Sequence, residues 1–137
     1  MSRIYLDACC IIYLVEAASP FHATIVSRLL RHQADPGSRL ITSRLSWLEC
    51  RIRPLKDNDH KLLAAYDQLF EANRMLIAEI TAEVVANAAI LRARYGFKTP
   101  DAIHLASAIE EKAELFLTGD SSLTRCTEIA VEVLETR

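Results

Sequence analysis

Short apolar runs alternate along this chain with longer segments in which apolar residues recur every three or four positions. The short runs predict strands, and they read RIYLD, RLITS, MLIAEI, LFLTGD and AVEVLE at residues 3–7, 39–43, 75–80, 115–120 and 130–135. The longer segments predict helices, which begin at about residue 8 and otherwise span about 21–34, 44–53, 59–73, 81–95 and 99–112. Strands that alternate with helices indicate parallel crossover connections. The pattern therefore predicts an α/β fold of three layers, α/β/α, with a mostly parallel central sheet of four to five strands.

Proline and glycine fall at the boundaries of these predicted elements, where they end one element and begin the next. They are Pro20, Pro36, Gly37, Pro54, Gly96, Pro100 and Gly119. The 137 residues contain no repeat and no low-complexity linker, and this length suits one compact domain. We therefore expect a single domain over residues 1–137.

Composition and charge exclude some of the functional classes to which this protein could belong. The formal net charge of −2 excludes a uniformly basic nucleic-acid-binding protein, but it is compatible with a local basic patch beside an acidic site. Cys9, Cys10, Cys50 and Cys126 have no C-x-x-C spacing, so we expect free, buried thiols in a reducing compartment. The longest apolar run, residues 8–15, is too short to cross a bilayer. These features predict a cytoplasmic protein without a membrane partner.

Two acidic residues follow predicted strands. Asp7 ends the first strand, and Asp120 lies two residues after the apolar run LFLT of the fourth. Parallel sheets of this kind bind ligands at the carboxyl ends of their strands. Each aspartate has an alternative role as a loop residue or helix cap. Their shared position favours a common site at that edge of the sheet.

Glu49 lies in the segment RLSWLECRI, on the edge of an apolar stripe that we expect to face the core. The stripe consists of Leu45, Leu48 and Ile52. A carboxylate in such a place is costly to bury unless a positive group meets it. The alternatives to a functional role are a salt bridge to Arg51 or Arg53, or a side chain that reaches solvent.

Asp101 stands in the segment TPDAIHLASA, behind a proline and before an apolar helical run. Thr99 is the expected N-cap and Pro100 the first helical residue, so Asp101 lies in the first turn. The helix dipole stabilises a negative charge there by about 0.3–1 kcal/mol. Asp101, His104 and Leu105 share one face, which we expect to be buried. His104 is close enough to approach a site at Asp101, but a histidine satisfied within the core is the favoured interpretation.

The four acids together predict a metal site. If Asp7, Glu49, Asp101 and Asp120 converge, their charges repel one another and require a counter-charge. Oxygen ligands select a hard divalent cation, so we expect Mg²⁺, with Mn²⁺ as an alternative. Zinc is not expected, because the histidines show no ligand spacing.

The motifs that contain these acids resemble those of PIN domains, specifically the VapC-type ribonuclease toxins of bacterial toxin–antitoxin pairs. The similar segments are IYLDACCIIYLVE, SRLSWLECRIRPL, TPDAIHLASA and LFLTGDSSL, which occur in the family's order between residues 4 and 123. The resemblance implies a PIN-like nuclease domain that cleaves RNA endonucleolytically with a metal-activated water. It implies that Asp7, Glu49, Asp101 and Asp120 are the catalytic and metal-binding residues. It also implies a VapB-type antitoxin as partner and a homodimer.

Binding of RNA or of an antitoxin requires positive and polar groups near the acids. The candidate contacts are Arg44, Arg51, Arg53, Lys56, Thr118 and Ser121. Compensation of a helix dipole and turn formation are their alternative roles. The apolar surface near Ile11, Leu14 and Val15 is a candidate interface for a homodimer. Burial of these residues in the core is the simpler interpretation.

The chain departs from the family pattern directly after its first aspartate. The family usually has Ser or Thr there and often Asn or Ser next, whereas this chain has Ala8 and Cys9. We expect the missing hydroxyl to weaken the orientation of Asp7, and with it the metal affinity or the rate. The departure leaves open a catalytically weak PIN-like module that binds RNA or protein. A phosphoacceptor receiver domain fits less well, because Asp7 has no acidic neighbour and the terminal segment VEVLETR has no lysine.

Overall fold

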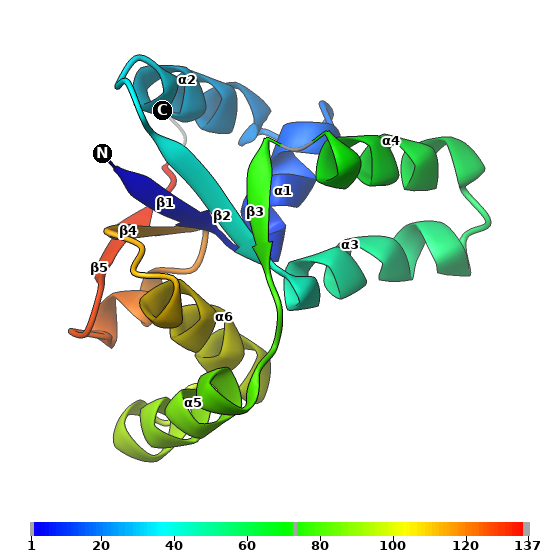
Figure 1. Ribbon diagram of the computed structural model, residues 1–137. Coiled ribbons are helices and arrows are strands. Elements are labelled where there is room, and N and C mark those ends of the chain that lie inside the picture. Colours follow the sequence, from blue (N-terminus) through cyan, green and yellow to red (C-terminus); the bar gives the residue numbers. More distant parts are fainter. Residues whose placement is uncertain (1, 73, 136–137) are drawn as a thin grey trace.

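The computed structural model describes residues 2–72 and 74–135, and its centre is a five-stranded sheet (Figure 1). The strands are β1 (Arg3–Leu6), β2 (Arg39–Ser43), β3 (Met75–Ala78), β4 (Leu115–Thr118) and β5 (Ala130–Val133). They lie in the order β3-β2-β1-β4-β5, and each neighbouring pair is parallel. The predicted parallel sheet is confirmed, with five strands.

Helices cover both faces of the sheet. They are α1 (Ala8–Val15), α2 (His22–Gln33), α3 (Arg44–Lys56), α4 (His60–Glu71), α5 (Ala82–Tyr95) and α6 (Thr99–Glu110), with a 3₁₀ helix η1 at Ser121–Arg125. Helices α5 and α6 lie on one face, α1 and α2 lie on the other, and α3 and α4 form a hairpin that projects to one side (Figure 1). This arrangement confirms the three-layer prediction. Among the described residues, no helix is long and apolar enough to cross a membrane.

Alternate residues of β1 and β4 supply the two layers of the core. Tyr5 and Phe116 are fully buried, and their rings stack at 5.1 Å in the cluster formed with α5 and α6. Leu6 and Leu117 point to the other face, into the cluster formed with α1 and α2. A buried strand with apolar residues on both faces is what a parallel sheet between two helical layers requires.

The cysteines are free, as predicted. Cys10, Cys50 and Cys126 are buried, and Cys9 is half-buried. Burial raises the pKa of Cys50 to about 12 and also raises the pKa of Cys10 and Cys126. These three buried side chains therefore remain thiols at neutral pH.

Helix α3 differs from the prediction in both its length and its buried face. It continues past Arg53 to Lys56, because Pro54 lies in the last turn, where the loss of one backbone donor does not break the helix. Its buried residues are Ser46, Cys50 and Pro54. The predicted stripe is wrong: Leu48 and Ile52 are 51% and 56% exposed. The small buried side chains allow α1 and α4 to pack closely on α3, and the larger apolar ones face outward.

Helix termini agree with the sequence signals at some places and not at others. Thr81 caps α5 by accepting a hydrogen bond from the amide of Val84, and Gly96 ends that helix with a positive φ of 75°. The N-cap of α6 is Lys98 rather than Thr99. The Thr99 hydroxyl accepts a hydrogen bond from Arg92 instead, at 3.3 Å. The predicted end of the fourth helix, at residue 73, falls outside the described residues.

Candidate functional site

The strand order places β1 and β4 side by side at the point where the chain changes direction across the sheet. From β1 the chain continues to β2 and β3 on one side, and then returns to β4 and β5 on the other. The crevice at the carboxyl ends of two such strands is the usual ligand site in an open parallel sheet. Asp7 follows β1 and Asp120 follows β4, so both acids lie at this crevice. The two acids thus follow strands that lie side by side, and their common ligand site stays a prediction.

Asp7 accepts three hydrogen bonds, two from adjacent residues at the start of α1 and one from the end of β4. Its Oδ1 accepts hydrogen bonds from the amide of Cys10, at 3.2 Å, and from the thiol of Cys9, at 2.8 Å. Its Oδ2 accepts a hydrogen bond from the Thr118 hydroxyl, at 2.5 Å. Asp7 therefore caps α1 and also presents a fixed carboxylate to the crevice. The expectation of a poorly oriented Asp7 is corrected, because Cys9 and Thr118 supply donors despite the missing hydroxyl.

The role of the Cys9 thiol gives a first prediction. Cys9→Ala removes one donor to the Asp7 carboxylate and is expected to lower any metal-dependent activity about 10-fold, the lower end for groups that orient metal ligands. Cys9→Ser keeps a donor at the same position and is expected to retain activity within about threefold of wild type. The initial rate of that activity and the apparent metal affinity, measured for both variants and wild type, check both values. Equal activity in Cys9→Ala and wild type would contradict this role for the thiol.

Asp101 and Asp120 line one cavity of about 210 Å³. The other lining residues are Gly96, Phe97, Lys98, Ser122 and Arg125. Burial raises the pKa of Asp101, and the negative charge of Asp120 raises it further. His104 acts in the opposite direction, and Asp7 and Glu49 add smaller increases. The carboxylate of Asp101 thus experiences the charges of the other three predicted acids.

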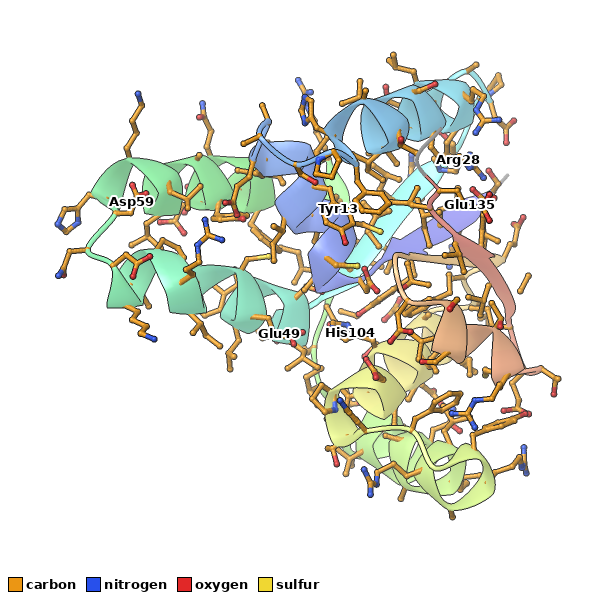
Figure 2. The ribbon with its side chains drawn as sticks, turned by 180° about the vertical axis from the view of Figure 1, so that it is seen from behind. Tyr13, Arg28, Glu49, Asp59, His104 and Glu135 are labelled. Atoms are coloured by element: carbon orange, nitrogen blue, oxygen red, sulfur yellow. The ribbon has the colours of Figure 1, made fainter. Side chains whose placement is uncertain are left out.

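Glu49 is paired with a histidine and not with either of the arginines that were its alternative partners. His104 Nε2 lies 2.5 Å from Glu49 Oε1, and the two side chains meet between α3 and α6 (Figure 2). Arg51 pairs with Asp67 and Arg53 pairs with Glu16. The alternative of a salt bridge from Glu49 to Arg51 or Arg53 is therefore excluded.

His104 connects Glu49 to the core of the sheet. The ring is 4% exposed, and its Nδ1 lies 2.8 Å from the hydroxyl of Tyr5. That hydroxyl donates a hydrogen bond to Ser43 Oγ, also at 2.8 Å. The interpretation of His104 as a satisfied core histidine is confirmed only in part, because one ring nitrogen faces Glu49. The three-residue spacing from Asp101 indicated that His104 could approach the acids, but it gave no signal that Glu49 is its partner.

The basic residues that sequence analysis selected do not line the cavity of Asp101 and Asp120. Arg44 pairs with Glu79 at 2.8 Å, Arg51 and Arg53 are paired as described above, and Lys56 is exposed at the far end of α3. The basic residues at the cavity are Lys98 and Arg125, which the sequence analysis missed. The only feature of the sequence that could have indicated them is their proximity along the chain to Asp101 and Asp120.

Of the two polar candidates, Thr118 contacts another site residue. Its hydroxyl donates to Asp7 and accepts a hydrogen bond from the amide of Asp120, at 3.1 Å. Asp120 in turn accepts one from the amide of Ser122 and so begins η1. Ser121 is exposed at the start of η1. Thr118 therefore links the two acids that follow β1 and β4.

The family model of the PIN domain matches residues 4–129 of this sequence. The chain belongs to the PIN domain family. No curated protein sequence matches it. Its fold is similar to that of VapBC2 from Rickettsia felis bound to a promoter DNA fragment, with a TM-score of 0.79, 14% identity, and coverage of 97% of this chain and 99% of that chain.

Two further solved structures share the fold of this PIN domain. One is VapBC-1 from nontypeable Haemophilus influenzae, with a TM-score of 0.74 and 20% identity, covering 96% of this chain and 97% of that one. The other is VapC20 from Mycobacterium tuberculosis, described as a toxin that cleaves the sarcin-ricin loop, with a TM-score of 0.71 and 19% identity, covering 93% of this chain and 98% of that one. These likenesses show the three-layer architecture.

The donor set of this PIN domain fits a hard divalent cation. The predicted acids offer carboxylate oxygens. Burial, and after it the negative charge of Asp120, raises the pKa of Asp101, and a cation would offset both effects. Within the described residues, the group of three potential ligand atoms that lie within 4.8 Å of one another belongs to Asp7, Cys9 and Cys10. Cys10 is a poor ligand, because its buried thiol donates to the carbonyl of Leu117. No three of the predicted carboxylates form such a group among the described residues. An ion such as Mg²⁺, which keeps several waters, does not take all of its ligands from the protein.

Proposed function

We propose that this PIN domain is a Mg²⁺-dependent endoribonuclease, the toxin of a type II toxin–antitoxin system. Mn²⁺ is the alternative ion. The observation that carries the proposal is the placement of the acids: Asp7 and Asp120 follow the adjacent strands β1 and β4 and are joined through Thr118, and Asp101 lines one cavity with Asp120. The similarity in fold to VapC20, a toxin described as cleaving RNA of the sarcin-ricin loop, supports the choice of RNA as substrate.

In this proposal the four carboxylates hold the ion, and the residues behind them fix their positions. A bound divalent ion would lower the pKa of a coordinated water and would offset negative charge on the phosphate. Thr118 and Cys9 keep both oxygens of Asp7 in place through the hydrogen bonds given above. His104, supported by Tyr5, keeps Glu49 in place. One of the four acids accepts a proton from the water that attacks the phosphate.

A VapB-type antitoxin is the proposed protein partner, and the cytoplasm is the proposed location. Several structures of similar fold are toxin–antitoxin complexes. The acidic crevice would attract an arginine of a bound antitoxin by a charge-assisted hydrogen bond. Arg44, Arg51, Arg53 and Lys56 remain proposed outer contacts for RNA or antitoxin, together with Thr118 and Ser121.

A homodimer remains part of the proposal, but a different surface from the one selected by sequence analysis is the candidate interface. Ile11 is fully buried, and Leu14 and Val15 pack against the core, which supports the simpler interpretation of these three residues. The exposed apolar stripe of α3 is the better dimer surface. It consists of Leu48, Ile52 and Leu55.

Cleavage of RNA by purified protein tests the proposed function. Antitoxin-free protein is incubated with structured cellular RNA in Mg²⁺, in Mn²⁺ and in EDTA, and the products are separated on a denaturing gel. We expect fragments in either ion, none in EDTA, and recovery when Mg²⁺ is added in excess of EDTA. Equal cleavage in EDTA would contradict metal-dependent chemistry. Absence of cleavage of every RNA tried, by folded protein, would favour the binding-only PIN module.

A further inference from the structure

We propose that Lys98 and Arg125 form a binding site for a backbone phosphate of RNA, next to the acids that hold the metal. The proposal rests on the proposed function, because it assigns the neighbouring phosphate contact of the same substrate. The juxtaposition that carries it is a cavity of about 210 Å³ lined by both basic residues and by Asp101 and Asp120.

The two basic residues come from segments that also carry the acids. Lys98 precedes α6 and is followed three residues later by Asp101. Arg125 ends η1, the short helix that begins after Asp120. The two basic residues therefore reach one cavity with the acids from two separate segments of the chain. Several water molecules of about 30 Å³ each would fit in this volume, which leaves room for a phosphodiester group.

Arg125 is fixed before any ligand binds. Its Nε donates a hydrogen bond to the carbonyl of Ser122 at 3.2 Å, and its Nη1 donates one to the carbonyl of Tyr95 at 2.8 Å. Its guanidinium carbon lies 4.8 Å from the centre of the Phe97 ring. These contacts use two of the five N–H donors of the guanidinium, so three remain for a ligand. A cation held in place loses little side-chain freedom when it binds a phosphate.

Neither basic residue has a carboxylate partner within ion-pair distance in the described part of the chain. Ion pairs there engage Arg28, Arg44, Arg51, Arg53 and Arg94, together with the His104–Glu49 pair. An arginine already in an ion pair gains less from a phosphate, because it must share its donors or leave its partner. Lys98 and Arg125 have their charges available at the mouth of the acidic site.

The charge balance of the cavity supports the same assignment. Acidic side chains repel the RNA backbone, and a metal ion offsets that repulsion only at the phosphate it contacts. Phosphates on either side of the cleaved bond still approach a negative surface and need separate cations. Lys98 and Arg125 lie where such a flanking phosphate would reach the cavity. They supply affinity and position without reading the base sequence.

Salt-dependent RNA binding by charge-neutralised variants tests the proposal. Lys98→Gln, Arg125→Gln and the double variant are made in an Asp7→Asn background, so that bound RNA is not cleaved. Fluorescence anisotropy of a fluorescein-labelled single-stranded RNA of mixed sequence is measured in Mg²⁺ over a range of KCl concentrations. Each substitution is expected to weaken binding about three- to tenfold and to reduce the slope of log K against log[salt] by about 0.7.

Matched controls separate this site from a general loss of positive charge. Lys61→Gln on α4 and Arg31→Gln on α2 remove exposed charges outside the cavity, and they are expected to change affinity less than twofold. Arg125→Lys keeps the charge and is expected to keep most of the salt slope. Lys98 makes no side-chain hydrogen bond within the described residues, so Lys98→Gln also serves if Arg125→Gln is poorly folded.

The outcomes distinguish this proposal from the proposed function. If wild type cleaves RNA but the double variant binds it with unchanged affinity and slope, the phosphate site is wrong and the nuclease stands. If the two substitutions weaken RNA binding but wild type never cleaves, the phosphate site stands and the nuclease is wrong. No measurable RNA binding by the Asp7→Asn protein, or an equal loss in the control variants, would overturn the phosphate site.

Discussion

Asp101→Asn is expected to lower RNA cleavage by about 100-fold or more while leaving the protein folded. The amide keeps the size of the side chain but removes the negative charge that a metal ligand of this site requires. Initial rates in saturating Mg²⁺ measure the loss. Asp57→Asn is the matched control, because Asp57 is an exposed acid that follows α3, and it should cleave as wild type does. Cleavage by Asp101→Asn within a few-fold of wild type would contradict a role for this carboxylate.

The same variant is expected to be more stable than wild type when metal is removed. Burial and the charge of Asp120 raise the pKa of Asp101 in the folded protein. Stability from this group is present below its unfolded pKa and is lost as the pH rises through the folded pKa, so the ionised carboxylate costs stability at pH 7. The expected gain is under about 1 kcal/mol, because solvent screens a partly exposed group. Thermal unfolding of both proteins in EDTA at pH 4 and pH 7 measures it. The gain is expected at pH 7 and should be smaller at pH 4, and an unfolding temperature of Asp101→Asn below that of wild type at pH 7 would contradict the account.

Substitution of Asp7 is expected to have the second large effect on activity, and its effect on stability depends on which residue replaces the aspartate. Asp7→Ala removes the cap of α1 and leaves the Thr118 hydroxyl without its acceptor, which together cost about 1–3 kcal/mol. Asp7→Asn keeps an oxygen that accepts from the amide of Cys10 and removes the charge. Both variants should abolish growth arrest when expressed without an antitoxin, but Asp7→Ala should also unfold at lower denaturant concentration.

Growth curves, protein levels and urea unfolding together distinguish these effects. Growth arrest by the wild type and normal growth with Asp7→Asn at equal protein level would attribute toxicity to the carboxylate. Growth arrest that persists in Asp7→Asn at that level would show that toxicity does not depend on Asp7. Loss of toxicity in Asp7→Ala alone would indicate a stability effect.

Local signals predicted most of the fold. The apolar runs around Tyr5 and Phe116 identify buried strands, and the alternation with helices gives a parallel sheet without further information. Helix α3 was predicted less well, because an apolar stripe at helical spacing was assigned to the core. The core instead contacts Ser46 and Cys50, which become buried only because α1 and α4 pack against that side. Tertiary packing of this kind is absent from a single helix pattern.

The acids of the candidate site were visible in the sequence, but their partners were not. Asp7 and Asp120 were found because the ends of parallel strands meet at one edge. The pair of Glu49 with His104 joins residues 55 positions apart, and no local spacing distinguishes it from a pair with Arg53. Cys9 was read as a missing hydroxyl, although its thiol donates to Asp7. Pairings between distant elements depend on the three-dimensional fold.

Direct binding of Mn²⁺ tests the central claim that the four acids form a divalent metal site, and it does so without knowledge of the RNA target. Calorimetric titration of Mn²⁺ into metal-free protein, at an ionic strength that suppresses weak surface binding, is compared between wild type, Asp101→Asn and the control Asp57→Asn. The account predicts saturable binding to wild type and to Asp57→Asn, and binding weaker by at least about tenfold in Asp101→Asn. No saturable binding to wild type, or equal binding to all three proteins, would contradict it.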